Sequence, residues 1–165
     1  MIHKRSLIAG AAGAVAARSL LTRVALVKLR RDLRRLNAGD PGPLLAGYAD
    51  DAVLRFNEGP HRWSGEYRGK AAIERFLREF IAAGLTGEIR DLWIAGPPWA
   101  VRLAARFDDR ATGPNGEELY ANRVAIVART RWGKIVEHED FYEDTGRIVA
   151  FEEKLRALGI EAVAA

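Results

Sequence analysis

The chain has 165 residues, of which 48% are apolar and 29% are charged, a composition typical of one ordinary globular domain. It contains no cysteine, which excludes disulfides, thiolate metal sites and a cysteine nucleophile. Its three histidines, His3, His61 and His138, are too far apart for a zinc-ligand motif, so neither a metal nor another cofactor is expected.

The positive charge is concentrated at the N-terminus. Residues 1–38 contain nine lysines and arginines and one acid, Asp32, for a net charge of +8, whereas the remainder carries −4. This asymmetry indicates an anionic partner, and an anionic membrane surface contacted through residues 1–37 is the first candidate. No aromatic residue is interleaved with these basic residues, so nucleic acid is not expected.

Residues 1–17 form a basic and apolar N-terminal extension in front of a single domain over residues 18–160. The apolar run resembles an export signal, but it is about half as long as the roughly 20 residues of a membrane span. Three interpretations stay open: a plain helical extension, attachment to a membrane surface, or cleaved export. The expected compartment is the cytoplasm, with a membrane-peripheral location or export as alternatives.

Residues 18–37 are predicted to form an amphipathic helix. Leu26, Leu29, Leu33 and Leu36 repeat at i, i+3, i+7 and i+10, and arginines occupy the other side. The helix should end near Gly39. A short second helix over residues 41–50 should follow, with Asp40 as its cap.

The rest of the chain alternates between strand and helix patterns. Strands are predicted over residues 52–57, 86–94, 99–108, 119–130 and 135–142, and helices over residues 69–83 and 145–158. A hairpin turn is predicted at Asn115-Gly116, an N-cap at Asp144 and a helix stop at Gly159. Helices segregated from a run of antiparallel strands predict an α+β domain with helices on one face of a curved sheet.

Several segments together resemble one known fold. They are Leu36-Asn37-Ala38-Gly39-Asp40, residues 45–53, Tyr67-Arg68-Gly69-Lys70-Ala71-Ala72-Ile73, and Trp132-Gly133-Lys134-Ile135-Val136. The chain looks like the nuclear transport factor 2-like proteins, and among them the SnoaL-like proteins. This resemblance implies a cone-shaped, curved antiparallel sheet wrapped by helices. It does not imply one function, because the fold hosts isomerases, dehydratases, cyclases, hydrolases and binding modules.

A partial resemblance to limonene epoxide hydrolase involves residues of three predicted strands. Arg106-Phe107-Asp108 and Asp140-Phe141-Tyr142 match that family's Arg-x-Asp and later aspartate, and Asn57 matches an asparagine that holds a water. The resemblance implies that Asp140 is the base on water, Asp108 the protonated acid, and Arg106 the residue that orients both. Arg55 departs from the family, which has a tyrosine there.

Strand alternation permits these polar groups to converge. Arg106 and Asp108 share one face of their strand, and His138 and Asp140 share one face of theirs. The residues expected to line the pocket are Arg55, Tyr48, His61, Trp63, Asn122 and His138. Three alternatives stay open for the cluster: a catalytic site, a non-catalytic polar pocket, or salt bridges on an exposed face.

The expected function is therefore a cofactor-independent small-molecule enzyme with acid–base chemistry in an apolar pocket, either epoxide hydrolase-like or isomerase- or cyclase-like. Its expected partners are a hydrophobic small-molecule ligand and a second copy of the chain, in a homodimer formed through the sheet. The alternative is a non-catalytic ligand-binding or membrane-peripheral scaffold module.

Overall fold

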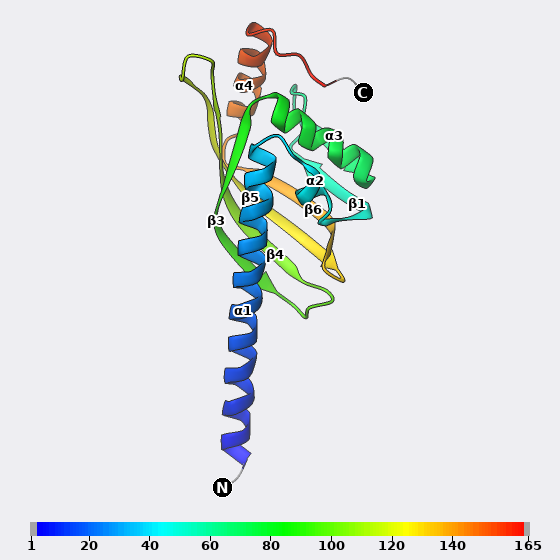
Figure 1. Ribbon diagram of the computed structural model, residues 1–165, viewed down its shortest axis with the longest axis vertical. Helices are drawn as coiled ribbons and strands as arrows, with labels where there is room; N and C mark the ends of the chain where they lie inside the picture. The colour runs from blue at the N-terminus through cyan, green and yellow to red at the C-terminus, as the bar shows by residue number, and fades with distance from the viewer. Residues whose placement is uncertain (1–2, 164–165) are drawn as a thin grey trace.

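The fold is an α+β cone built on one six-stranded sheet (Figure 1), seen in a computed structural model that describes residues 3–163. The strands are β1 (Tyr48–Phe56), β2 (Gly65–Arg68), β3 (Leu85–Ala95), β4 (Arg102–Thr112), β5 (Glu118–Arg131) and β6 (Lys134–Tyr142). Their order across the sheet is β2-β1-β6-β5-β4-β3. Strands β1 and β6 pair in parallel, and all other neighbours are antiparallel.

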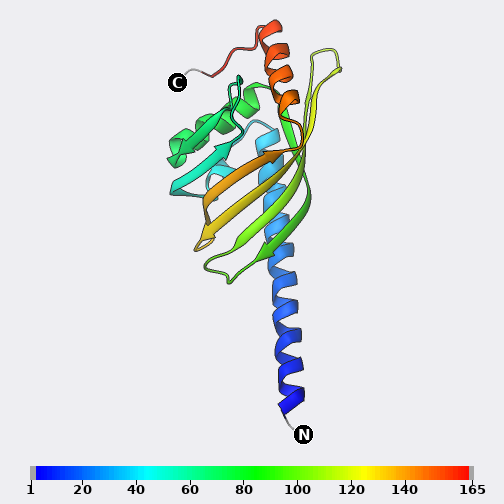
Figure 2. The same ribbon diagram turned by 180° about the vertical axis from the view of Figure 1, so that it is seen from behind.

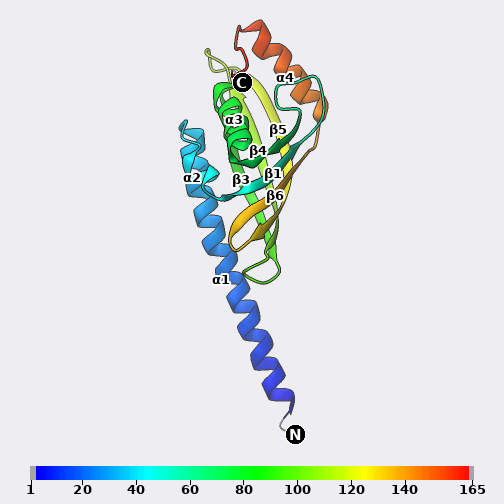
Figure 3. The same cartoon turned by 90° about the vertical axis from the view of Figure 1, so that its right-hand side faces the viewer.

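Four helices accompany the sheet: α1 (His3–Asn37), α2 (Gly42–Leu45), α3 (Gly69–Ala82) and α4 (Thr145–Ala157). Helices α1 and α3 lie on the concave face, and α4 lies at one end of the sheet (Figures 1 and 3). The view from behind shows that no helix of residues 3–163 covers the other face (Figure 2). The sheet therefore has an inner face that packs on the helices and an outer face that meets solvent.

Helix α1 packs on the sheet through the leucine face that its periodicity predicts. Leu33 and Leu36 are buried, and Leu26 and Leu29 pack against the core. At the helix end, the Asn37 side chain donates to the carbonyl of Gly87 and accepts from its backbone N–H, at 3.0 and 3.1 Å. Towards its N-terminus α1 continues past the end of the sheet (Figures 1 and 3). No helix among residues 3–163 is both long enough and apolar enough to cross a membrane.

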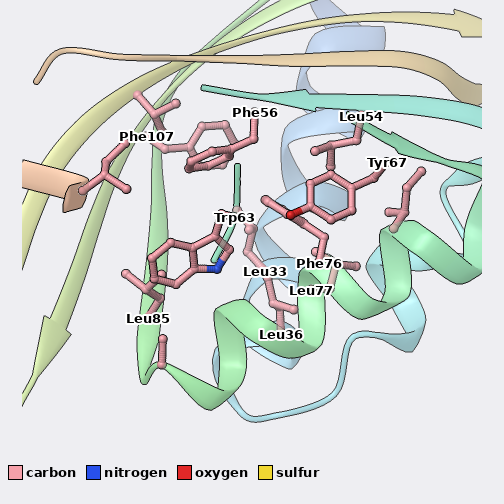
Figure 4. Close-up of a cluster of buried hydrophobic side chains, with 14 of the residues drawn as sticks. Leu33, Leu36, Leu54, Phe56, Trp63, Tyr67, Phe76, Leu77, Leu85 and Phe107 are labelled. Carbon is pink, nitrogen blue, oxygen red and sulfur yellow. The ribbon is translucent and has the colours of Figure 1, made fainter. Parts of the chain in front are cut away.

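The core fills the space between the concave face and the helices (Figure 4). Leu54 and Phe56 of β1 meet Phe76 and Leu77 of α3, and Trp63, from the loop before β2, packs beside Phe56. Trp63 also stacks on Phe151 of α4, with ring centroids 5.8 Å apart and planes at 4°. This aromatic packing closes the end of the cone at which α4 lies.

The predicted α+β class and cone-shaped sheet are confirmed, and most strand and helix bounds agree within a few residues. Asp144 caps α4 by accepting from the backbone N–H of Arg147, and Gly159 has φ = 72° after the helix, as predicted. The predicted helix over residues 41–50 is wrong, because α2 ends at Leu45 and β1 begins at Tyr48. Gly47 breaks the helix, and its carbonyl accepts from the N–H of Ile135 at the start of β6.

Candidate functional site

A chain of hydrogen bonds joins β1 to β6 on the inner face of the sheet. The hydroxyl of Tyr48 lies 2.5 Å from Nδ1 of His138, and Nε2 of His138 lies 2.7 Å from Oδ1 of Asp140. Tyr48 and Asp140 are buried, at 2% and 6% exposed. Burial, and secondarily the charge of Asp140, raises the pKa of Tyr48, so its hydroxyl remains protonated and donates. A neutral His138 satisfies both bonds if Nδ1 accepts from Tyr48 and Nε2–H donates to Asp140.

A second carboxylate, Asp109 of β4, is buried on the same inner face and 5% exposed. The hydroxyl of Tyr142 donates to its Oδ2 at 2.7 Å. Gly87 stands opposite Asp109 on β3, and a Cβ at that position would lie 3.3 Å from Asp109 Oδ1. The absence of a side chain at residue 87 therefore makes room for the carboxyl group.

The charge of Asp140 acts on Asp109. The pKa of Asp109 is raised to about 7, chiefly by burial; the hydrogen bond from Tyr142 opposes the shift, and the negative charges of Asp140 and Asp108 add smaller increases. A carboxyl group with a pKa near neutrality exchanges its proton readily at physiological pH. Asp109 and the Asp140–His138–Tyr48 chain share the inner face of the sheet and therefore provide one potential acid and one potential base.

Arg106 and Asp108 do not join this cluster, and the predicted arginine-bridged pair of carboxylates is wrong. Both residues lie on the outer face: Arg106 binds Asp91 of β3 at 2.9 Å, and Asp108 accepts from Arg90 at 2.7 Å. Successive side chains of a strand point to opposite faces, so a register error of one residue exchanges the two faces. The inward residues of this segment are Phe107 and Asp109.

Arg55 and Asn57 lie apart from the inner carboxylates. Arg55 points to the outer side and binds Glu66 of β2 at 2.9 Å, so it does not replace the pocket tyrosine of the epoxide-hydrolysing family. Asn57 follows β1, and its Oδ1 is buried without a hydrogen-bond partner among the described residues. Among residues 20–163, Asp109 accepts from Tyr142 and Asp140 pairs with His138, and neither bond involves Asn57.

Asn122, His61 and Trp63 are all buried, as expected of inner residues. Asn122 donates to the carbonyl of Asp144 at 2.7 Å and thereby fixes the start of α4. Burial lowers the pKa of His61, which packs edge-on against Phe56. Trp63 lines the inner cavity, and its Nε1 has no hydrogen-bond partner in the part of the chain that the structure describes.

The interior is nearly filled. Its cavity measures about 10 Å³ and is lined by Phe56, Trp63, Phe80, Leu85, Tyr120, Tyr142, Ile148 and Phe151. A larger open groove of about 630 Å³ lies outside, between the loop before β2 and the end of α4. Among the side chains that the structure describes, residues 20–163, no group of three or more histidine, aspartate or glutamate residues is placed to hold a metal ion.

Asp109 and Tyr142 were not predicted as a pair, although part of the signal was present. Ala105, Phe107 and Ala111 share the strand face of Asp109, whereas Arg102, Arg106 and Arg110 share that of Asp108. The apolar neighbours indicate that Asp109 is the inward carboxylate. The contact with Tyr142 depends on how β4, β5 and β6 are paired, which the local pattern does not contain.

Comparisons with solved structures agree with this fold. Bal32a, from a soil-derived mobile gene cassette, is 18% identical over 80% of this chain and 96% of its own, with a TM-score of 0.63. An NTF2-like protein from Burkholderia pseudomallei is 20% identical over 79% and 94%, with a TM-score of 0.60. TerC, co-crystallised with polyporic acid, is 21% identical over 82% and 98%, with a TM-score of 0.61. Such identities show a shared fold.

No curated protein sequence is significantly similar to the chain. A model of the SnoaL-like domain family, however, matches residues 29–138, which include α2, α3, the inward carboxylate of β4 and His138 of β6. The chain therefore belongs to the SnoaL-like family.

Proposed function

We propose that this protein is a cofactor-independent enzyme that performs acid–base chemistry on a small hydrophobic molecule. The observation that carries the proposal is that Asp109, whose pKa is raised to about 7, shares the buried inner face with the chain of Asp140, His138 and Tyr48. Buried ionisable groups with shifted pKa values are concentrated at functional sites. The crystallisation of TerC with polyporic acid adds that a protein of this fold accommodates a small organic molecule.

The two carboxylates have distinct roles in the proposed chemistry. Asp140, oriented by His138, is the base, and protonated Asp109 is the acid. In epoxide hydration, Asp140 takes a proton from water as the water oxygen attacks the epoxide carbon, and Asp109 protonates the oxygen released from that carbon. In isomerisation or cyclisation, Asp140 removes a proton next to a carbonyl group and Asp109 protonates the carbonyl oxygen.

A second candidate is a non-catalytic ligand-binding or scaffold module. The observation that favours it is the cavity volume of about 10 Å³, which leaves room for about one water molecule. An enzyme of this structure has to open its interior before a substrate reaches Asp109 or Asp140, and the aromatic side chains around Tyr142 are the groups that have to move. A scaffold needs no such opening.

The experiment combines two assays with matched variants. Diol formation from terpenoid and aromatic epoxides reports hydration, and exchange of α-protons of hydrophobic ketones in D₂O, followed by NMR, reports proton abstraction. Asp109→Asn and Asp140→Asn should each lower the active reaction about 10²–10⁴-fold, the usual contribution of a general acid or base. Asp108→Asn is the control, because Asp108 is the adjacent carboxylate on the outer face.

Each result separates the candidates. If Asp108→Asn and Asp109→Asn lower the reaction rate equally, or if Asp140→Asn leaves the rate unchanged, the assigned acid and base are wrong. If the wild-type protein turns over neither substrate class but a compound from either panel raises its melting temperature, the binding module replaces the enzyme.

A further inference from the structure

The side of α1 that faces away from the sheet carries an apolar stripe. Leu20, Val24 and Val27 follow at i, i+4 and i+7, with exposed fractions of 64%, 60% and 69%. An α-helix advances about 100° per residue, so these three side chains lie on one face. The opposite face of the same helix is the one that buries Leu33 and Leu36, so the stripe plays no part in the core.

Three arginines border this stripe along one flank. Arg23, Arg30 and Arg34 are exposed and lie within about 40° of one another on the helix. None of the three forms an ion pair with another described residue. The basic residues on the other flank have carboxylate partners instead. Lys28 and Arg31 bind Asp32, at 2.5 and 3.0 Å, and Arg35 binds Asp40 at 2.7 Å.

The lack of carboxylate partners distinguishes these arginines from many others in the molecule. On the outer face of the sheet, arginines at positions 90, 106, 123 and 129 each pair with an aspartate or glutamate. The flank of α1, where three arginines lie together without a carboxylate partner, therefore keeps its positive charge. An apolar stripe beside uncompensated basic residues is the pattern of helices that lie in the interface of an anionic bilayer.

The geometry points to a lipid surface rather than to another partner. We propose that α1 docks on an anionic phospholipid membrane, with Leu20, Val24 and Val27 at the boundary of headgroups and acyl chains and the arginines on the phosphates. Since α1 runs past the sheet, its exposed face is accessible without rearrangement of the domain (Figures 1 and 3). A second copy would bring two positive flanks together, and residues 20–37 contain no aromatic side chain to stack on nucleic-acid bases. The docking does not depend on whether the inner site is catalytic.

The test uses the full chain and sedimentation with vesicles. Phosphatidylcholine vesicles that contain phosphatidylglycerol should bind the protein, and vesicles of phosphatidylcholine alone should bind it weakly. Changing Arg23, Arg30 and Arg34 together to Gln should weaken binding about a hundredfold, or roughly fivefold for each arginine. The matched control changes Arg106, Arg123 and Arg129 to Gln, which removes the same charge from the outer face of the sheet and should retain most of the binding.

A second set of variants tests the apolar part of the face. Changing Leu20, Val24 and Val27 together to Ser should reduce vesicle binding at high salt, where the electrostatic contribution is screened. Circular dichroism should show that every variant keeps its helical content, since all the changed side chains are exposed.

The docking would be overturned if the protein did not bind anionic vesicles or bound neutral vesicles equally well. It would also be overturned if the two sets of arginine variants lost the same amount of vesicle binding, or if the serine variants bound vesicles as well as the wild-type protein. If the serine variants change the oligomeric mass but not vesicle binding, the stripe serves a second copy. Binding to duplex RNA that the arginine variants abolish, without vesicle binding, would assign the flank to nucleic acid.

Discussion

Asp108 and Asp109 are adjacent in the chain, but their surroundings are opposite. Asp108 forms an exposed ion pair with Arg90, an interaction of the kind that contributes about 0–1 kcal/mol. Asp109 is removed from water, and the charge of Asp140 adds to this effect, so its charged form is disfavoured. One step along a strand thus separates a surface aspartate from one suited to proton transfer.

This difference predicts a specific dependence of stability on pH. The pKa of Asp109 is about 7 in the folded protein, against an ordinary value of 3.8, so between these values the folded state holds more protons than the unfolded state. The raised pKa of Asp109 therefore contributes to the free energy of unfolding. This contribution is fully present below about pH 4 and is lost as the pH rises through about 7, and the loss is on the order of a few kcal/mol. Asp109→Asn should remove this loss, and Asp108→Asn should keep it.

Urea unfolding from pH 5 to pH 8, compared between each variant and wild type, measures the effect. A wild-type free energy of unfolding whose pH dependence equals that of Asp109→Asn would show that Asp109 titrates normally.

The sequence located part of the inner cluster. The alternation of β6 correctly groups His138 with Asp140, and that of β5 groups Asn122 with Val124. Alternation shows which residues share a face, but it does not show which face points inward. For this reason the sequence prediction places Arg106 and Asp108 inside, on the face of β4 that is in fact the outer one. The bond between Tyr48 and His138 joins residues 90 positions apart, so no local pattern contains it.

At the scale of elements, one arginine holds three segments together. The side chain of Arg62, in the loop before β2, is 3% exposed and binds Glu152 of α4 at 2.8 Å. It also donates to the carbonyls of Ile160 and Glu161, at 2.7 and 3.1 Å. The loop, the last helix and the segment after it therefore share one buried cation.

Removal of this cation should be costly. Arg62→Ala leaves Glu152 buried without its main partner, and breaking a buried ion pair in this way costs about 3–5 kcal/mol. Arg156→Ala removes the other partner of Glu152, but Arg156 is 66% exposed, so its loss should cost about 0–1 kcal/mol. Thermal unfolding measures the stability that each variant loses. Equal losses of stability would show that burial does not set the strength of the ion pairs of Glu152.

The elements themselves were more predictable than their contacts. Periodic leucines predicted the packed part of α1, and β3, β5, β6 and α4 lie within a few residues of their predicted bounds. The predicted helix over residues 41–50 is too long because the pattern around Tyr48 fits both a helix and a strand. In the structure Tyr48 belongs to a strand, because β1 pairs in parallel with β6 there.

At the scale of the whole molecule, the outer face of the sheet leaves apolar side chains in solvent. Trp93, Val127 and Phe141 are 57%, 49% and 48% exposed. Trp93 and Val127 flank Ala104 in one row across β3, β4 and β5, and Phe141 stands beside Ala125 in the next row. An exposed apolar patch bordered by charged residues is typical of a protein interface, so the homodimer through the sheet remains a prediction.

Sedimentation velocity tests this prediction. The wild-type protein should sediment as a dimer of the 18.2 kDa chain, and Val127→Lys with Phe141→Lys should give a monomer, because four lysines would be buried at the interface. Trp99→Lys adds charge at a 55% exposed side chain in the loop between β3 and β4 and should leave the dimer intact. A monomeric wild-type protein would leave this face without a partner copy.

The order of the strands also constrains how the protein is made. Strands β1 and β2 form one hairpin, β3, β4 and β5 form a separate meander, and only β6 bonds to both. During synthesis on the ribosome these two pieces exist before the strand that joins them, with the edges of β1 and β5 unpaired. The strand that carries His138, Asp140 and Tyr142 is thus also the one that completes the sheet, so the hydrogen bonds from this strand to Tyr48 and Asp109 form in the same step that joins the two pieces.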